Sequence, residues 1–180
     1  MAKCQMSATS KRVMTVALVC LLAGCAARGV EIKRRHIDAP FNEEESRAAM
    51  LPGGNTVTGS AFLRQNGGAV VTCAGATVHL IPATAYARER VSWLYGADGP
   101  SGMTRKAYTF DPDPSAYVQH SRTTRCDQHG NFEIAGLRKG TYYVSTTVTW
   151  IVAGTEQGGY LMALVKVEDS GAPTKVIMAF

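Results

Sequence analysis

Residues 126–144 read "CDQHGNFEIAGLRKGTYYV", and this stretch decides the fold. It holds two runs of alternating apolar residues, "NFEI" and "TYYV", separated by short segments that contain glycine. Alternation with a period of two predicts half-buried β-strands, and the glycines predict tight turns between them. We expect Asp127 to cap the first turn through its own backbone and Gly130 to adopt a positive φ.

Similar short segments fill most of the chain from Thr56 onward. The predicted strands span residues 56–64, 69–73, 76–83, 131–134, 141–152, 159–167 and 175–180. The longest of them, 141–152, places Tyr142, Val144, Thr146, Val148, Trp150 and Val152 on one face. Seven or eight short strands joined by glycine-rich turns predict an all-β fold with a single β-sandwich over residues 56–180.

The pattern D-x-x-G-x-F-x-F, a turn with G-L, and then G-x-Y-x-V runs through the same stretch. Its positions are occupied by Asp127, Gly130, Phe132, Gly136, Leu137, Gly140 and Tyr142. The stretch resembles carboxypeptidase regulatory-like, or transthyretin-like, domains, with a good match over 126–144 and a looser one over 57–82. The resemblance implies an Ig-like sandwich of about seven strands without catalytic activity. Its catalytic relatives, the hydroxyisourate hydrolases, end in Tyr-Arg-Gly-Ser, whereas this chain ends in "KVIMAF".

The N-terminus has the features of an export signal. Lys3, Lys11 and Arg12 precede the uncharged run "VMTVALVCLL", and small residues follow it. The quartet "LAGC" at 22–25 resembles the lipobox of bacterial lipoproteins. That resemblance implies a signal peptide over 1–24 and cleavage before Cys25. It also implies a diacylglyceryl group on the Cys25 sulfur and a further acyl chain, such as palmitate, on the new N-terminus. It also favours the outer membrane if the cell has two membranes.

Residues 25–55 form a predicted flexible tether. They carry clustered charges and end in Pro-Gly-Gly. Within the tether, Asn42 is expected to cap a short helix with acids in its first turn. Removing the signal leaves 19 − 3 = 16 basic against 14 acidic residues. A net charge of 16 − 14 = +2 gives no basis for nucleic-acid binding.

Two cysteines, Cys73 and Cys126, stay with the domain after export and acylation. An even pair in an exported chain, each at the end of a predicted strand, predicts a disulfide. The alternatives are a metal site at Cys126 and His129, or a cysteine nucleophile with His79, His120 or His129 as its base. The spacing lacks a second ligand pair for zinc, so no metal or other cofactor is expected. Asp111 and Asp113 in "FDPDPS" are expected to form a rigid turn.

Residues 83–117 interrupt the strand pattern as a partly helical insertion. The segment "ATAYARERVSWLYG" favours a helix, and the rest is rich in Gly, Pro and Asp. Aromatic and basic side chains gather here, among them Trp93, Tyr95, Arg105, Tyr108 and Phe110. Aromatics with arginine suit sugar stacking or a protein contact. A satellite core beneath a long loop is the alternative interpretation.

The sequence therefore predicts a non-catalytic lipoprotein of the cell envelope. It would present a β-sandwich near the membrane to an envelope protein or glycan, with residues 83–117 carrying the contact surface. A metal-dependent or Cys/His-dependent periplasmic enzyme is the alternative.

Overall fold

Strands dominate the computed structural model, which describes residues 32–100 and 102–180. In chain order the elements are β1 (Lys33–His36), α2 (Glu43–Ala49), β2 (Asn55–Arg64), β3 (Val70–Thr72), β4 (Thr77–Pro82), α3 (Ala85–Tyr95), β5 (Met103–Thr104), β6 (Tyr108–Asp111), α4 (Ala116–Gln119), β7 (Arg122–Arg125), β8 (Asn131–Leu137), β9 (Gly140–Val152), β10 (Thr155–Val167) and β11 (Thr174–Ala179). The predicted signal peptide and Cys25 lie outside the described residues. No helix within the described ranges is long and apolar enough to cross a membrane.

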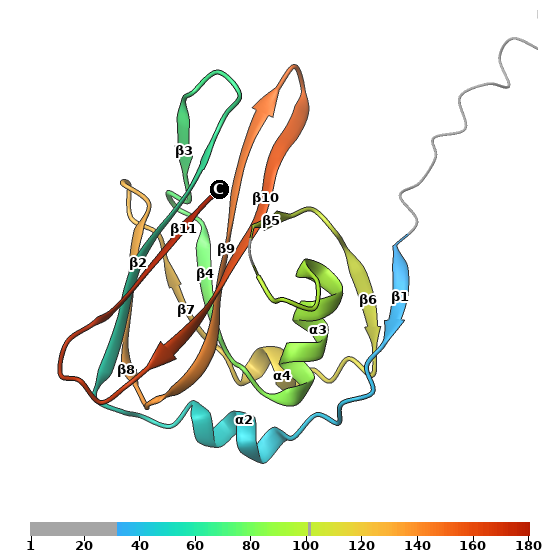
Figure 1. The fold of residues 1–180 in the computed structure, drawn as a ribbon, viewed down its shortest axis with the longest axis vertical. Helices are drawn as coiled ribbons and strands as arrows, with labels where there is room; N and C mark the ends of the chain where they lie inside the picture. The colour runs from blue at the N-terminus through green and yellow to red at the C-terminus, as the bar shows by residue number, and fades with distance from the viewer. Residues whose placement is uncertain (1–31, 101) are drawn as a thin grey trace, which may run out of the picture. The chain divides into compact units, whose positions relative to one another are not determined.

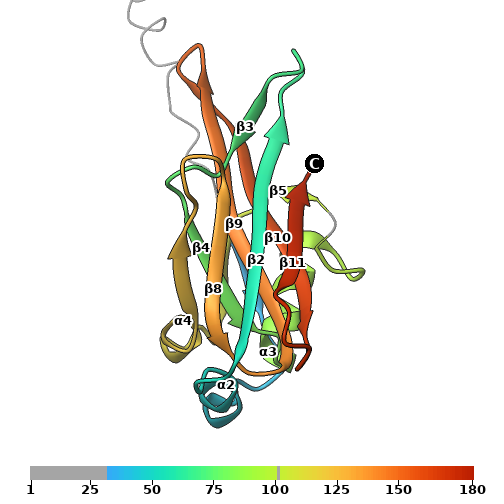
Figure 2. The same cartoon turned by 90° about the vertical axis from the view of Figure 1, so that its left-hand side faces the viewer.

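Two sheets face each other as a sandwich (Figures 1 and 2). The five-stranded sheet has the order β5-β10-β9-β4-β7, and the four-stranded sheet has β11-β2-β3, with β8 also paired to β2. The all-β prediction is confirmed. The sandwich has nine strands where seven or eight were predicted. The two strands outside the predicted ranges are β5, which is only two residues long, and β7, "RTTR", which has no apolar residue to give an alternating pattern.

The main core lies between the two sheets. Val57, Ala61 and Leu63 of β2 face Val144 and Val148 of β9 across it, and all five are buried. The predicted inner face of residues 141–152 is buried only as far as Val148. Beyond Val148 the β9–β10 hairpin runs to the end of the sandwich where the β2–β3 hairpin of the facing sheet also ends (Figures 1 and 2). Trp150 is half-buried there and Val152 is exposed.

The tether prediction is wrong for residues 32–55, which fold onto the domain. Strand β1 pairs in parallel with β6, from Lys33 opposite Tyr108 to His36 opposite Asp111. Ile37 is 2% exposed, and the amides of Asp38 and Ala39 donate to the Glu89 carboxylate at 2.9 and 2.7 Å. Their partners come from the insertion, so the local composition of 25–55 could not reveal this packing.

The helix within this segment forms as predicted. The Asn42 side chain accepts a hydrogen bond from the Glu45 amide at 3.0 Å, and three glutamates occupy the first turn of α2. Carboxylates at this end of a helix interact favourably with its dipole.

The insertion covers part of the outer face of the five-stranded sheet. Its predicted helix is α3, which packs Ala87 and Val91 against Tyr143 and Met162 of that face. The remainder was expected to be loop, but it contains β5 and β6. Figure 1 shows α3, α4 and the β1–β6 pair on one side of the sandwich.

Candidate functional site

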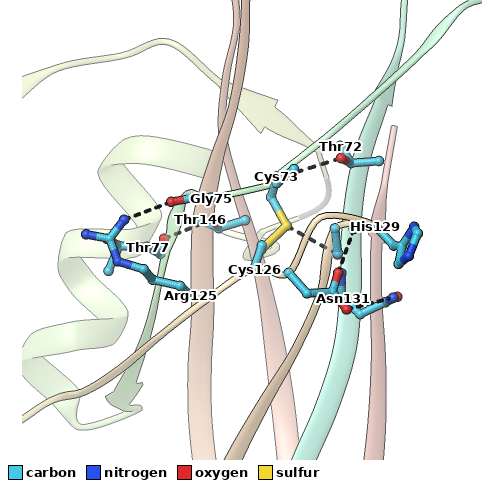
Figure 3. The surroundings of a disulfide bond; sticks show 12 residues. Thr72, Cys73, Gly75, Thr77, Arg125, Cys126, His129, Asn131 and Thr146 are labelled. Carbon is cyan, nitrogen blue, oxygen red and sulfur yellow. Dashed lines mark hydrogen bonds between the residues drawn. A yellow bond between two sulfur atoms is a disulfide. The ribbon is translucent and has the colours of Figure 1, made fainter.

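Cys73 and Cys126 form the predicted disulfide, with Cα atoms 5.8 Å apart (Figure 3). The bond joins the loop after β3 to the loop before β8, and both cysteines are buried. His129 is exposed and points away from the disulfide (Figure 3). The two sulfurs are therefore neither nucleophiles nor metal ligands, which removes the thiol that the Cys/His alternative needs.

The turn beside the disulfide is organised by Asp127, as predicted. Its Oδ1 accepts hydrogen bonds from the amides of His129 and Asn131 at 2.8 and 2.9 Å. These backbone hydrogen bonds, led by that of Asn131, hold the pKa of Asp127 below its ordinary value. Gly130 has a φ of +81°, and a Cβ there would lie 2.5 Å from Thr72 Cβ. The apparent cluster at 126–129 is thus a structural corner.

The other residues of the opening stretch also have structural roles. Phe132 and Leu137 are buried between the sheets, Gly136 adopts a positive φ, and Gly140 begins β9. The Tyr142 hydroxyl lies 2.9 Å from the carbonyl oxygen of Arg138, four residues upstream. This contact closes the β8–β9 connection in the manner of a tyrosine corner.

An aromatic pocket of about 300 Å³ lies between α3, β6 and the outer face of the five-stranded sheet. Its aromatic lining consists of Tyr95, Tyr108, Phe110, Tyr117 and Tyr160, and its polar lining of Arg90, Thr104, Lys106 and Ser145. Concave sites with an apolar wall and a few polar groups are where small molecules bind. We name it the aromatic pocket and treat it as the candidate site.

The fold brings together three of the five residues predicted to carry the contact surface. Tyr95, Tyr108 and Phe110 all line the aromatic pocket. Trp93 is 38% exposed and lies under the Arg35 guanidinium, 4.6 Å from Cζ to the ring centroid. Arg105 lines a separate cleft.

The insertion also has the satellite core that the alternative interpretation expected. Phe110 is 7% exposed and forms this core with Ile37 and Tyr86. Phe110 therefore shapes the pocket wall as a core residue, which agrees with the alternative interpretation for this side chain.

Arg90 joins the pocket to this satellite core. Its Cζ lies 4.1 Å from the Phe110 ring centroid and 4.5 Å from that of Tyr117. Burial alone would lower the pKa of Arg90, but hydrogen bonds to the Tyr86 hydroxyl and the Asp113 carboxylate outweigh it and raise the pKa. The guanidinium is therefore a fixed positive charge inside an aromatic cage. Asp111 and Asp113, the predicted rigid turn, pair with Arg34 and Arg90 respectively.

Burial keeps two phenols of the pocket wall uncharged. Burial raises the pKa of Tyr117 to about 12 and raises that of Tyr95 as well, so both hydroxyls are protonated at neutral pH. The Tyr95 hydroxyl donates to the carbonyl oxygen of Tyr160 at 3.1 Å, which ties α3 to β10 at the pocket.

Tyr160 is the pocket residue that sequence reasoning missed. It lies on β10 with 56% of its surface exposed, next to the buried Leu161. A second hollow of about 300 Å³, lined by Thr147, Thr149 and Arg105, also has Tyr160 at its border. The only sequence signal was an outward-facing tyrosine directly after two glycines, Gly158 and Gly159.

The polar side chains of the pocket can form hydrogen bonds with a ligand. The polar lining includes two cations and two hydroxyls but no carboxylate, histidine or thiol. Within the described residues, no group of three or more His, Cys, Asp or Glu side chains is arranged to hold a metal ion.

The chain is similar to a solved structure from Pseudomonas aeruginosa, described as that of a "putative carbohydrate binding protein". The two share 26% sequence identity and superpose with a TM-score of 0.60. The similarity covers 79% of this chain and 99% of the other. No known family matches the chain. No curated protein matches it either. The resemblance to carboxypeptidase regulatory-like domains stays a prediction from the motif at 126–144.

Proposed function

We propose that this protein is a glycan-binding lipoprotein without catalytic activity, whose sugar site is the aromatic pocket. The observation that carries the proposal is the exposed ring of Tyr160 beside a concave wall of further aromatics. The C–H faces of sugar rings pack on aromatic rings, and sugar hydroxyls need polar partners such as those of Lys106, Thr104 and Ser145.

The similar structure from Pseudomonas aeruginosa supports binding over catalysis, because that protein is described as a "putative carbohydrate binding protein". The transthyretin-like motif supports the same view, since the domains that it resembles serve as binding or structural modules. Most residues that line the aromatic pocket belong to 83–117, the part of the chain that departs from that motif, where a ligand site peculiar to this protein is expected.

The membrane part of the proposal rests on the lipobox at 22–25. Cys25 precedes the first described residue, Ile32, by 32 − 25 = 7 positions. Seven residues reach roughly 25 Å at about 3.5 Å each. Acylation of Cys25 would hold the folded unit close to the bilayer, nearer than a tether reaching to residue 55 would allow.

The anchor is tested by palmitate labelling of cells that express the wild type or Cys25→Ala. We expect the label and detergent-dependent fractionation with the wild type, and loss of both with Cys25→Ala. A labelled, membrane-bound Cys25→Ala variant would contradict lipidation at this residue.

The glycan site is tested on detergent-solubilised full-length protein with an array of neutral and acidic oligosaccharides and peptidoglycan fragments. Tyr160→Ala should weaken binding about tenfold, equivalent to ~1.4 kcal/mol. Leu164→Ala is the matched control, since Leu164 lies on the same strand and is 49% exposed. Equal affinities for the wild type and Tyr160→Ala would place any glycan elsewhere.

A further inference from the structure

A cleft of about 680 Å³ opens at the end of the sandwich where the β2–β3 and β9–β10 hairpins of the two sheets both end. We call it the inter-sheet cleft. Six of its lining residues carry the argument: Arg64, Asn66, Arg105, Trp150, Gln157 and Phe180. They come from the β2–β3 and β9–β10 hairpins, the segment after β5 and the residue after β11.

The backbone is shaped to place Trp150 in this cleft. Gly158 has a φ of +83°, and a Cβ there would lie 2.1 Å from the Val148 carbonyl oxygen and 2.9 Å from the Trp150 ring. Only glycine therefore allows the indole to lie against β10 at this point. Phe180, 47% exposed, supplies a second aromatic surface to the cleft from the other sheet.

The two arginines in the cleft are held by backbone carbonyl groups rather than by carboxylates. Arg64 Nη1 donates to the Gly68 oxygen at 3.3 Å, and Arg105 Nη2 donates to the Glu156 oxygen at 3.0 Å. Among the described residues, neither guanidinium forms a salt bridge, and no acidic side chain lines the cleft. A guanidinium has five N–H donors, so each keeps donors for a ligand.

We propose that the inter-sheet cleft binds acidic oligosaccharides, with sugar rings against Trp150 and Phe180 and sugar carboxylates paired to Arg64 and Arg105. The planar guanidinium matches a carboxylate with two parallel hydrogen bonds, which gives it strength and orientation. The side-chain amides of Asn66 and Gln157 offer both donors and acceptors to sugar hydroxyls. The inference extends the proposed glycan function to a charge class, but it uses residues outside the aromatic pocket.

Arg105 gives this site a connection to the first one. It also lines the hollow that Tyr160 borders on the outer face of the five-stranded sheet. The edge strand β5 lies between the aromatic pocket and the inter-sheet cleft, since Thr104 lines the pocket and Met103 lines the cleft. Glu156 also lines that hollow, so the acidic groups of a ligand are expected to pair with Arg64 and Arg105 in the cleft itself.

The test is calorimetric titration of the detergent-solubilised full-length protein with hexamers of galacturonate, hyaluronate and maltose, and with methyl-esterified hexagalacturonate. The ester keeps the sugar rings but removes their charge. Arg64→Gln and Arg105→Gln remove the proposed cations. Arg125→Gln is the matched control, because Arg125 is an exposed arginine that also donates to a carbonyl group, that of Gly75 at 3.0 Å, outside the cleft.

We expect an acidic hexamer to bind at least tenfold more tightly than the ester and than maltohexaose. Arg64→Gln and Arg105→Gln should each weaken that binding about tenfold, and Arg125→Gln less than twofold. The inference fails if neither acidic hexamer binds, if the ester binds equally well, or if Arg125→Gln costs as much as Arg64→Gln. Neutral binding that depends on Tyr160 but not on the arginines would leave the proposed function standing and overturn only this inference.

Discussion

Replacing Arg90 by methionine should show that the aromatic cage holds the insertion on the sandwich. The Arg90 side chain is only 15% exposed and stacks with Phe110 and Tyr117. Its Nη1 also lies 3.0 Å from the Tyr86 hydroxyl. Methionine keeps an unbranched apolar stem but removes the guanidinium, so the change isolates the charged group from the volume that it fills.

The expected loss of stability is ~2–3 kcal/mol. A hydrogen bond to a charged group contributes roughly 1.5–3 kcal/mol, and each cation–π contact about 0.5–1 kcal/mol. Part of this is offset because the substitution removes the desolvation cost of Arg90. The pair with Asp113, whose side chain is 52% exposed, adds little because solvent screens it. The Tyr86 hydroxyl keeps a partner, donating to the Pro112 oxygen at 2.6 Å, so no buried donor is orphaned.

Urea unfolding followed by circular dichroism measures the loss, and amide hydrogen exchange locates it. Arg88→Met is the control, since Arg88 lies two positions earlier on α3 and is exposed. We expect Arg90→Met to lower the free energy of unfolding and to speed exchange in α3 and β6, with Arg88→Met close to wild type. A loss below about 0.5 kcal/mol for Arg90→Met, or an equal loss for both variants, would refute the cage.

Three further predictions concern the sandwich itself. The free energy of unfolding should fall by about 4 kcal/mol in Cys73→Ser, in Cys126→Ser and in the double variant, which is the chain-entropy value for a disulfide that spans 53 residues. Additive losses in urea unfolding would show that the two sulfurs act independently. Thermal melting should show that Gly158→Ala lowers the free energy of unfolding by at least ~2 kcal/mol more than Gly154→Ala, because both glycines have a positive φ but only the Cβ at 158 meets other atoms. Equal losses of stability would contradict the close approach at Trp150. The folded-state pKa of Asp127 is lowered by backbone hydrogen bonds, so its stabilising effect is present above the unfolded pKa of about 3.9 and is lost as the pH falls through the folded value. The stability difference between wild type and Asp127→Asn should therefore be present at pH 7 and shrink below pH 4, and a difference that stays constant in acid would exclude this origin.

The strands that sequence alternation revealed are those with one face in the main core. Strand β2 is the clearest case, because Val57, Ala61 and Leu63 are buried. Strands β1 and β6 pair over 70 positions apart in the sequence, and β1 reads "KRRH". Its formation depends on pairing with β6 in the insertion, so local composition predicted a tether instead.

The candidate site was predictable in part for a similar reason. The density of aromatics at 83–117 drew attention to Tyr95, Tyr108 and Phe110, which do converge. Sequence alone could not divide them between core and surface, because Phe110 is buried by Ile37, far upstream. Tyr160 and Trp150 escaped notice as ligand groups because both lie in regular strands, where alternation explains an aromatic residue without reference to a ligand.

The most direct test of the central claim is an amide chemical-shift titration of the isotope-labelled, detergent-solubilised protein with the best-binding neutral oligosaccharide of the array. The account predicts shift changes concentrated at Tyr95, Lys106, Ser145 and Tyr160 around the aromatic pocket, and their loss in Tyr160→Ala. Shift changes confined to the outer face of β2, β8 and β11, or no saturable change with any oligosaccharide, would contradict it.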